Sequence, residues 1–195
     1  MRWWGSMCTG SGGRMGVDVG VVTIGNIERG LVAWLVRRLT EEMGGSVAFV
    51  AALPLPRSAY DPKRGQFRGE AILRLLRDIP LVDAERVVAV VGADCYAGRL
   101  NFVFGLAALE GRESLVALPY LCSNYNSRRP SQGEVYERVL KEALHELGHT
   151  RGLRHCENPT CVMYFSNTLS DTDRKSHRYC ESCKRKLVGA AKPTI

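Results

Sequence analysis

The chain has 195 residues, 45% of them hydrophobic, and a formal net charge of +7. This length and composition are typical of one globular domain with a sizeable core, and no apolar run approaches the roughly 18 residues that a membrane-spanning helix needs. These features exclude a helical membrane protein, and we expect a cytoplasmic monomer.

The first 16 residues show no periodic pattern. Two tryptophans precede a run of glycine and serine from Gly10 to Gly13, and the segment lacks the features of a secretory signal peptide. We therefore expect residues 1–16 to form a flexible tail, with the first regular element beginning at Val17.

From Val17 the chain alternates apolar β-branched runs with helical patterns. The patterns predict strands over 17–24, 47–52 and 86–92 and helices over 28–43 and 66–77. This βαβαβ order predicts a mainly parallel, twisted sheet that helices cover. Two short strands, 100–104 and 114–118, follow without a helix between them, and the first is predicted to run antiparallel at the sheet edge.

The predicted edge strand includes Asn101, Phe102, Val103 and Phe104. The unpaired backbone of an edge strand can bind an extended peptide as an added strand, so these residues are candidates for substrate binding. The alternative is a plain edge strand that a loop covers. The polar segment 121–130 that follows is predicted to be a surface loop beside the substrate cleft.

A helix is predicted from about residue 131 to residue 152. Ser131 followed by Glu134 forms a capping box at its start. One half of the helical wheel is apolar, with Val135, Tyr136, Val139, Leu140, Ala143, Leu144 and Leu147. Because His145 and His149 lie off this stripe, we expect the apolar half to pack on the core and the histidines to line a cleft.

The eleven-residue segment that begins at His145 has the pattern H-E-x-x-H-x-x-G-x-x-H. Histidines four residues apart on a helix can reach one cation, and Gly152 allows the left-handed turn that presents His155 as a third ligand. Glu146 then stands beside the metal as a general base for an activated water. For a bare H-E-x-x-H the alternative is a pair of surface histidines, which the aligned glycine and third histidine argue against.

Four cysteines follow in two short pairs, C-x4-C and C-x2-C, at Cys156, Cys161, Cys180 and Cys183. This spacing favours a closed, tetrahedral, structural zinc site. The alternative is two disulfides or a redox pair, but a reducing compartment would keep the thiols available for metal. Because Cys156 adjoins His155, we hypothesise that the cysteine site also fixes the direction of the third histidine.

These two motifs in succession resemble the archaemetzincins, a branch of the metzincin zinc peptidases, in which H-E-x-x-H-x-x-G-x-x-H runs into C-x4-C-x-M and closes with C-x2-C. Segments 101–107 and 161–166 resemble the family's upper-rim strand and Met-turn. The resemblance implies that His145, His149 and His155 bind a catalytic zinc ion and that Glu146 is the general base. It also implies that Met163 is the Met-turn residue and that a structural zinc ion is bound by Cys156, Cys161, Cys180 and Cys183.

Several neighbouring residues receive plainer interpretations. Without the resemblance, Met163 would be an ordinary core methionine, and Tyr164 is predicted to pack, with a contact to the transition state as the alternative. The remaining cysteines, Cys8, Cys95 and Cys122, are interpreted as unpaired thiols. His177, the only histidine outside the motif, is interpreted as a solvated loop residue.

The basic charge raises an alternative function, a non-catalytic zinc-stabilised module that binds nucleic acid or an acidic partner. Six cations surround the second cysteine pair, namely Arg174, Lys175, Arg178, Lys184, Arg185 and Lys186. Two considerations weaken this alternative. Four thiolates around zinc carry a formal charge of −2 that nearby cations compensate, and stacking aromatics are scarce beyond Tyr179.

The sequence therefore predicts a compact α/β (α+β) zinc peptidase of metzincin type, with a catalytic and a structural zinc ion in each chain. We expect an upper region at 17–152 with a mainly parallel sheet, one antiparallel edge strand and the active-site helix. A small, irregular lower region at 153–195 would be held by the cysteine zinc site, and a peptide or protein substrate would lie in the cleft between the two.

Overall fold

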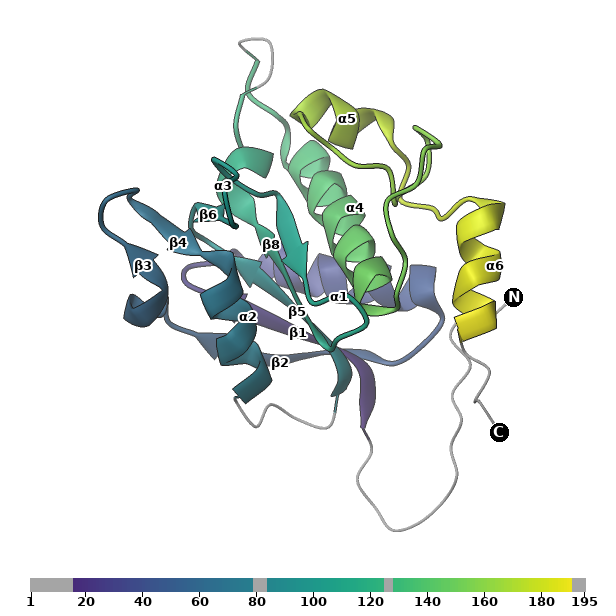
Figure 1. The fold of residues 1–195 in the computed structure, drawn as a ribbon, viewed down its shortest axis with the longest axis horizontal. Helices are drawn as coiled ribbons and strands as arrows, with labels where there is room; N and C mark the ends of the chain where they lie inside the picture. Colours follow the sequence, from purple (N-terminus) through teal and green to yellow (C-terminus); the bar gives the residue numbers. More distant parts are fainter. Residues whose placement is uncertain (1–15, 79–83, 125–127, 191–195) are drawn as a thin grey trace.

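The computed structural model describes residues 16–78, 84–124 and 128–190 and is built around a twisted sheet of five strands (Figure 1). The strand order is β2-β1-β5-β8-β7. The first four are mutually parallel and span Val47–Leu53, Val17–Ile24, Ala84–Val91 and Glu113–Ala117. β7, at Gly105–Ala107, pairs antiparallel with β8 at the edge. The predicted mainly parallel sheet with one antiparallel edge strand is confirmed, while the predicted tail lies outside the described residues apart from Gly16.

Helices cover both faces of the sheet and create two separate cores. α1 (Arg29–Met43) and α4 (Gln132–Thr150) pack on one face, and α2 (Gly69–Asp78) packs on the other (Figure 1). Successive side chains of a strand point to opposite faces. In β5, Val88 and Val90 accordingly face α1 and α4, whereas their neighbours face α2.

The predicted helix at 66–77 begins later than expected. Residues Gln66–Arg68 form β4, which pairs antiparallel with β3 (Tyr60–Asp61) and parallel with β6 (Cys95–Tyr96) in a second, three-stranded sheet. A short 3₁₀ turn at Arg57–Ala59 precedes β3. This small sheet lies beside α2, at the left of Figure 1.

The predicted edge strand at 100–104 is wrong in position, because the strand that forms is β7, which begins at residue 105. Two side chains of the β3–β4 hairpin donate hydrogen bonds to backbone carbonyls of the loop that precedes β7. The Arg64 guanidinium donates to the carbonyls of Leu100 (2.9 Å) and Asn101 (3.1 Å), and the Gln66 amide also donates to the Asn101 carbonyl (2.7 Å). The segment 101–107, which resembles an upper-rim strand, therefore consists of a loop at 101–104 that these side chains hold and of strand β7 at Gly105–Ala107.

α4 begins as predicted. The Ser131 hydroxyl accepts the Glu134 N–H, and the Glu134 carboxylate accepts the Ser131 N–H. The hydrogen bond from Arg128 and those from Ser131 lower the pKa of Glu134 to about 2. The apolar half of the helix, from Val139 to Leu147, is buried in the core against α1 and the sheet.

The chain beyond α4 is irregular and lies along the outer side of that helix (Figure 1). Besides α3 (Leu118–Leu121), which precedes α4, the remaining helices are α5 (Leu169–Arg174) and α6 (Glu181–Ala190). α5 begins with its own capping box between Thr168 and Asp171. In the part of the chain that is described, no helix has the length and apolar character needed to cross a membrane.

Candidate active site

Three histidine side chains meet at the C-terminal half of α4. His145 and His149 lie one turn apart, and their Nε2 atoms are 3.0 Å from each other. The His155 ring centroid lies 5.4 Å from that of His145 and 4.9 Å from that of His149. One nitrogen from each ring lies within 4.8 Å of the other two. The three predicted ligands are therefore brought together.

His155 reaches this position because the chain reverses at Gly152. Gly152 has a φ of 81°, the left-handed conformation that glycine adopts without steric cost. Its N–H donates to the His149 carbonyl (2.9 Å), and the Leu153 N–H donates to the Gly148 carbonyl (3.0 Å). These two bonds form a Schellman motif, which ends the helix and turns the chain back as predicted.

Hydrogen bonds to backbone carbonyls orient the two helical histidines. His145 Nδ1 lies 2.8 Å from the Val162 carbonyl, and His149 Nδ1 lies 2.7 Å from the Leu153 carbonyl. Because a carbonyl oxygen can only accept, each Nδ1 must carry the hydrogen. In a neutral ring this leaves the Nε2 lone pair free, which is the arrangement that metal-binding histidines use.

The surroundings keep all three imidazoles neutral. Burial lowers the pKa of His145 well below its ordinary value, and the positive charge of Lys175 adds to this effect. Burial also lowers the pKa of His149 and of His155. Three neutral imidazoles with converging nitrogens fit a zinc ion that retains one open position, the arrangement typical of catalytic zinc sites.

Glu146 lies beside this cluster and is only 5% exposed. Burial raises its pKa well above the ordinary value, and the negative charge of Glu142 raises it further. A bound cation would oppose that rise. The carboxylate packs against Gly105 of β7, where a Cβ atom would overlap it. Glycine at position 105 is thus required for Glu146 to face the cleft, a requirement that the sequence analysis missed.

Met163 lies beneath α4 and is fully buried. A Cβ atom on Gly148 would lie 2.5 Å from the Met163 Sδ atom, so a larger residue at this position would force the Met163 side chain to move. Tyr179 packs at the same place and donates to the Leu144 carbonyl (2.6 Å). The sequence analysis identified Met163 by resemblance, but it gave no role to Gly148.

A cleft of about 720 Å³ runs over the histidine cluster. Its walls are largely apolar and include Leu100, Asn101, Phe102, Val103, Phe104, Leu106, Leu109 and Phe165. The candidate residues 101–104 therefore do line the cleft, although as a loop. Phe165, which is 43% exposed, lies 4.7 Å from the His155 ring, whereas Tyr164 does not line the cleft.

The four predicted cysteine ligands also converge. Their sulfur atoms all lie within 4.8 Å of one another, with 3.8 Å from Cys156 to Cys180 and from Cys161 to Cys183. All four are free thiols, so these residues form neither of the two disulfides that the alternative interpretation required. Although burial opposes it, hydrogen bonds from Cys183 and the neighbouring sulfur atoms lower the pKa of Cys180 to about 7. Four converging thiols fit a closed structural zinc site.

The two clusters are connected through short stretches of chain. Cys156 follows His155, and its N–H donates to the Met163 carbonyl (2.9 Å). Cys161 precedes Val162, whose carbonyl orients His145. Each of these two cysteines is therefore a chain neighbour of a residue that forms or orients the histidine site.

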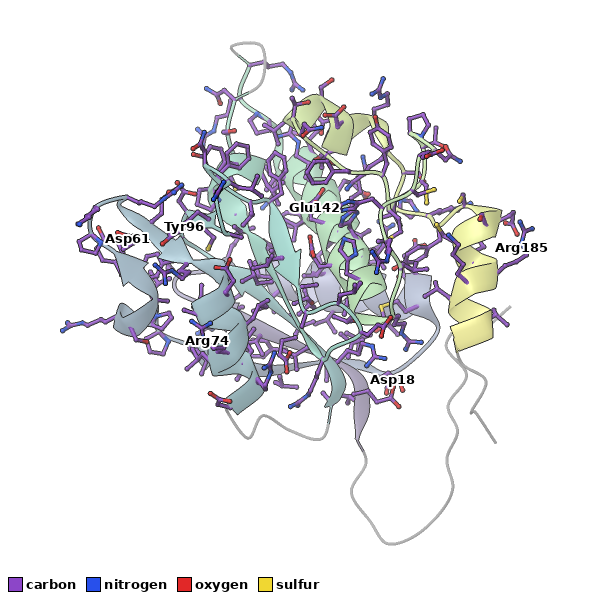
Figure 2. The ribbon with its side chains drawn as sticks, in the orientation of Figure 1. Asp18, Asp61, Arg74, Tyr96, Glu142 and Arg185 are labelled. Carbon is purple, nitrogen blue, oxygen red and sulfur yellow. The ribbon has the colours of Figure 1, made fainter. Side chains whose placement is uncertain are left out.

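Three of the six cations near the second cysteine pair, Arg174, Lys175 and Lys184, form ion pairs with carboxylates of the protein. Lys175 is buried, and its Nζ lies 2.9 Å from Glu142 Oε1 in an ion pair inside the protein. Figure 2 shows Glu142 in the interior, on α4, whereas Arg185 lies on the outside of α6. Arg174 pairs with Asp171 (3.3 Å), and Lys184 pairs with Glu181 (2.6 Å). Lys175, one of the six cations on which the alternative function depended, is therefore not available to a nucleic acid.

Two further interpretations are resolved by the structure. His177 lies in a loop, as predicted, and its side chain is 25% exposed, between Glu42 (3.3 Å) and Glu137 (3.8 Å), so it is less solvated than expected. Cys95 and Cys122 are free thiols, as predicted. Burial raises the pKa of Cys95 to about 12. Cys8 lies outside the described residues.

The sequence matches the model of peptidase family M54 over residues 36–188. The archaemetzincin of Methanocaldococcus jannaschii is 39% identical over 164 residues, which cover 84% of this chain and 89% of that protein. The archaemetzincin of Pyrococcus abyssi is 40% identical over 173 residues, covering 86% of this chain and 92% of that one. Among crystal structures, archaemetzincin from Methanopyrus kandleri aligns with a TM-score of 0.77 at 35% identity, covering 90% of this chain and 97% of that one. Archaemetzincin from Archaeoglobus fulgidus, complexed with malonate, aligns with a TM-score of 0.74 at 33% identity, covering 86% and 99%.

Proposed function

The chain belongs to peptidase family M54 and is a zinc metallopeptidase, and we propose that it hydrolyses peptide bonds in the cleft beneath β7 with Glu146 as general base. One observation carries this proposal. Three histidine nitrogens converge beside a buried carboxylate, and all four groups open onto the same cleft.

In this proposal His145, His149 and His155 hold the catalytic zinc. When bound, zinc supplies a Lewis acid that polarises the substrate carbonyl and makes water acidic enough to react near neutral pH. The Val162 and Leu153 carbonyls keep the ligand nitrogens of the two helical histidines directed at the metal.

Glu146 moves the proton in the proposed reaction. Its carboxylate accepts a proton from the attacking water and then donates it to the amine that leaves. Its buried surroundings raise its pKa above that of an ordinary glutamate, which favours the proton-donating half of this cycle. Gly105 supports this role, because the absence of a side chain there leaves room for the carboxylate.

We propose that the substrate lies along β7 as an added strand. β7 occupies the end of the sheet, with β8 on its other side, so its outer backbone groups have no strand partner in the described sheet. An extended peptide that pairs there passes directly over Gly105 and therefore over Glu146. The loop at 101–104 would form the adjoining wall.

We also propose that each chain binds a second, structural zinc through Cys156, Cys161, Cys180 and Cys183. The sulfur geometry and the absence of disulfides among these four residues support this assignment. On this view the chain divides into an upper region at 17–152 and a lower region at 153–195 that the cysteine site stabilises, and the substrate cleft lies between them.

Zinc analysis combined with a peptide library tests the proposal. We expect about two zinc ions per chain and cleavage that Glu146→Gln reduces at least about 100-fold while zinc content stays unchanged. Glu157→Gln is the matched control, because Glu157 is exposed and does not line the cleft. Full cleavage by Glu146→Gln would reject the assigned base, and cleavage that survives complete zinc removal would reject the metal site.

A further inference from the structure

Arg154 is a cation in the cleft that has no ion-pair partner among the described residues. It is exposed, lines the cleft and directly precedes His155. Within residues 16–78, 84–124 and 128–190, no carboxylate lies within ion-pair distance of its guanidinium. Glu110, whose side chain packs against Gly152, also forms no ion pair with it.

The other charges of the cleft are already engaged. Glu142 lines the cleft, but its Oε1 atom accepts from Lys175 (2.9 Å) and Thr172 (3.2 Å), so its charge is balanced inside the protein. Glu146 is assigned to the chemistry. Among the described lining residues, Arg154 is therefore the one charged group that remains for a ligand, and most of its neighbours on the wall are apolar.

The position of Arg154 places this charge close to the bond that would be cleaved. Adjacent Cα atoms are about 3.8 Å apart, similar to the rise of about 3.3 Å per residue in an extended peptide. A group that Arg154 contacts therefore lies within a few residue positions of the zinc site. The Glu110 side chain packs against Gly152, and the Glu110 N–H donates to the His149 carbonyl (3.1 Å). The segment that carries Arg154 therefore lies near the C-terminal end of β7, which leads to Leu109.

We propose that Arg154 is a specificity-determining residue that binds a carboxylate of the substrate. The planar guanidinium donates two parallel hydrogen bonds to a carboxylate, an arrangement that a neutral amide cannot match. The preferred substrate is thus a peptide with a carboxylate within a few residues of the scissile bond, from an acidic side chain or from the C-terminus. This inference rests on the proposed peptidase function.

Matched peptides distinguish the sources of the carboxylate. One series carries Asp or Asn at each position on either side of a fixed cleavage site, and another carries a free or an amidated C-terminus. We expect kcat/KM to favour one carboxylate position by about 10- to 100-fold, the range of a charge-assisted hydrogen bond. If the peptide runs antiparallel to β7, the favoured position lies before the scissile bond, and if it runs parallel, after it.

The variant Arg154→Gln should abolish this preference, so that the ratio of kcat/KM for the carboxylate peptide to kcat/KM for the matched neutral peptide falls to about one. Arg154→Lys should restore part of it, since the charge remains but the paired geometry is lost. Arg185→Gln is the control, because Arg185 lies on the outside of α6 (Figure 2). Equal preference in the wild type and in Arg154→Gln would overturn the inference while leaving the peptidase assignment intact.

A binding measurement keeps the test independent of turnover. Calorimetric titration of the zinc-loaded Glu146→Gln protein with the Asp and Asn peptides should show the same 10- to 100-fold difference in Kd, and the added Arg154→Gln substitution should remove it. Equal Kd values for both peptides, or no binding of either, would overturn the role of Arg154. If the wild type binds the carboxylate peptide selectively but cleaves neither peptide, the proposed catalytic function is rejected while the role of Arg154 in binding is kept.

Discussion

Lys175 and Glu142 form an ion pair that is almost completely enclosed by the protein, with Nζ 2.9 Å from Oε1. The same lysine lies 3.4 Å from the Tyr164 carbonyl, in the turn that follows Met163. Thr172 donates to the same Glu142 oxygen (3.2 Å). The pair therefore connects the active-site helix to the irregular chain that forms the opposite side of the cleft.

Removing one partner of this pair should destabilise the protein strongly. Lys175→Met leaves a buried carboxylate without its cation, and we expect a loss of about 3–5 kcal/mol in the free energy of unfolding, measured by urea denaturation. Adding Glu142→Gln, which removes the stranded charge but keeps an oxygen for Thr172, should recover most of the loss. Lys184→Met, at an exposed pair with Glu181, should cost less than about 1 kcal/mol. A double variant as unstable as Lys175→Met alone would contradict this account.

A methyl group at position 105 should impair catalysis without removing the metal. In Gly105→Ala the new Cβ atom overlaps the Glu146 carboxylate, which must move away from its place beside the histidines. We expect kcat to fall by about 100-fold or more, as for loss of a general base, with unchanged zinc content. Gly133→Ala is the control, because its Cβ atom meets open space at the start of α4. Normal turnover by Gly105→Ala would show that the carboxylate has more freedom than the structure indicates.

The histidine site should make the stability of the metal-free protein sensitive to acid. The pKa of His145 is lowered in the folded state. Below a pH of about 6.5, His145 therefore binds a proton in the unfolded chain but not in the folded chain. Stability should therefore fall as pH decreases through that value. Glu146, with a raised pKa, has the opposite slope, because its stability contribution falls as pH rises above about 4.5.

Comparing two proteins isolates the histidine contribution. The free energy of unfolding of the metal-free wild type and of His145→Asn is measured by urea denaturation between pH 5.5 and pH 8 in steps of about half a unit. Both proteins contain Glu146, so its contribution to the pH dependence of the free energy of unfolding is the same in each. Because only the wild type contains His145, the wild type should lose more stability on acidification than His145→Asn does. Parallel curves would mean that His145 titrates alike in the folded and unfolded chains.

The cysteine site should control the metal affinity of the histidine site. Cys156 adjoins His155, and Cys161 adjoins Val162, whose carbonyl orients His145. We expect Cys180→Ser to weaken zinc binding at the histidines by about 10- to 100-fold, measured by competition with a chromophoric chelator. Cys122→Ser, at an exposed thiol, is the matched control. An unchanged affinity in Cys180→Ser would reject the coupling.

Local patterns predicted the central part of the fold. The β-branched runs located β1, β2 and β5 to within a few residues, and the capping box located the start of α4. The spacing of the histidines predicted their meeting, because helix geometry and a glycine turn are properties of a few adjacent residues. The cysteines converge as their spacing predicted.

The differences all depend on residues that are distant in the sequence. β7 begins later than predicted because Arg64 and Gln66 take the carbonyls of the preceding loop. Lys175 looks like a surface cation in a basic run, and only the fold reveals Glu142 beside it. The sequence around Gly105 does not indicate that glycine is needed there either, because the need arises from the Glu146 side chain on α4. Such contacts have no periodicity that a single sequence can display.

The connection between the cysteine and histidine clusters has a consequence for the newly made protein. A nascent chain that has been synthesised only as far as the end of α4 already contains His145, Glu146 and His149, but it lacks the Val162 carbonyl and the Met163 side chain that complete the site. Cys183, which completes the cysteine cluster, is synthesised later still. In the proposed function, hydrolytic capacity is therefore acquired only after the chain has been synthesised through Cys183, and a nascent chain that reaches only the end of α4 lacks it.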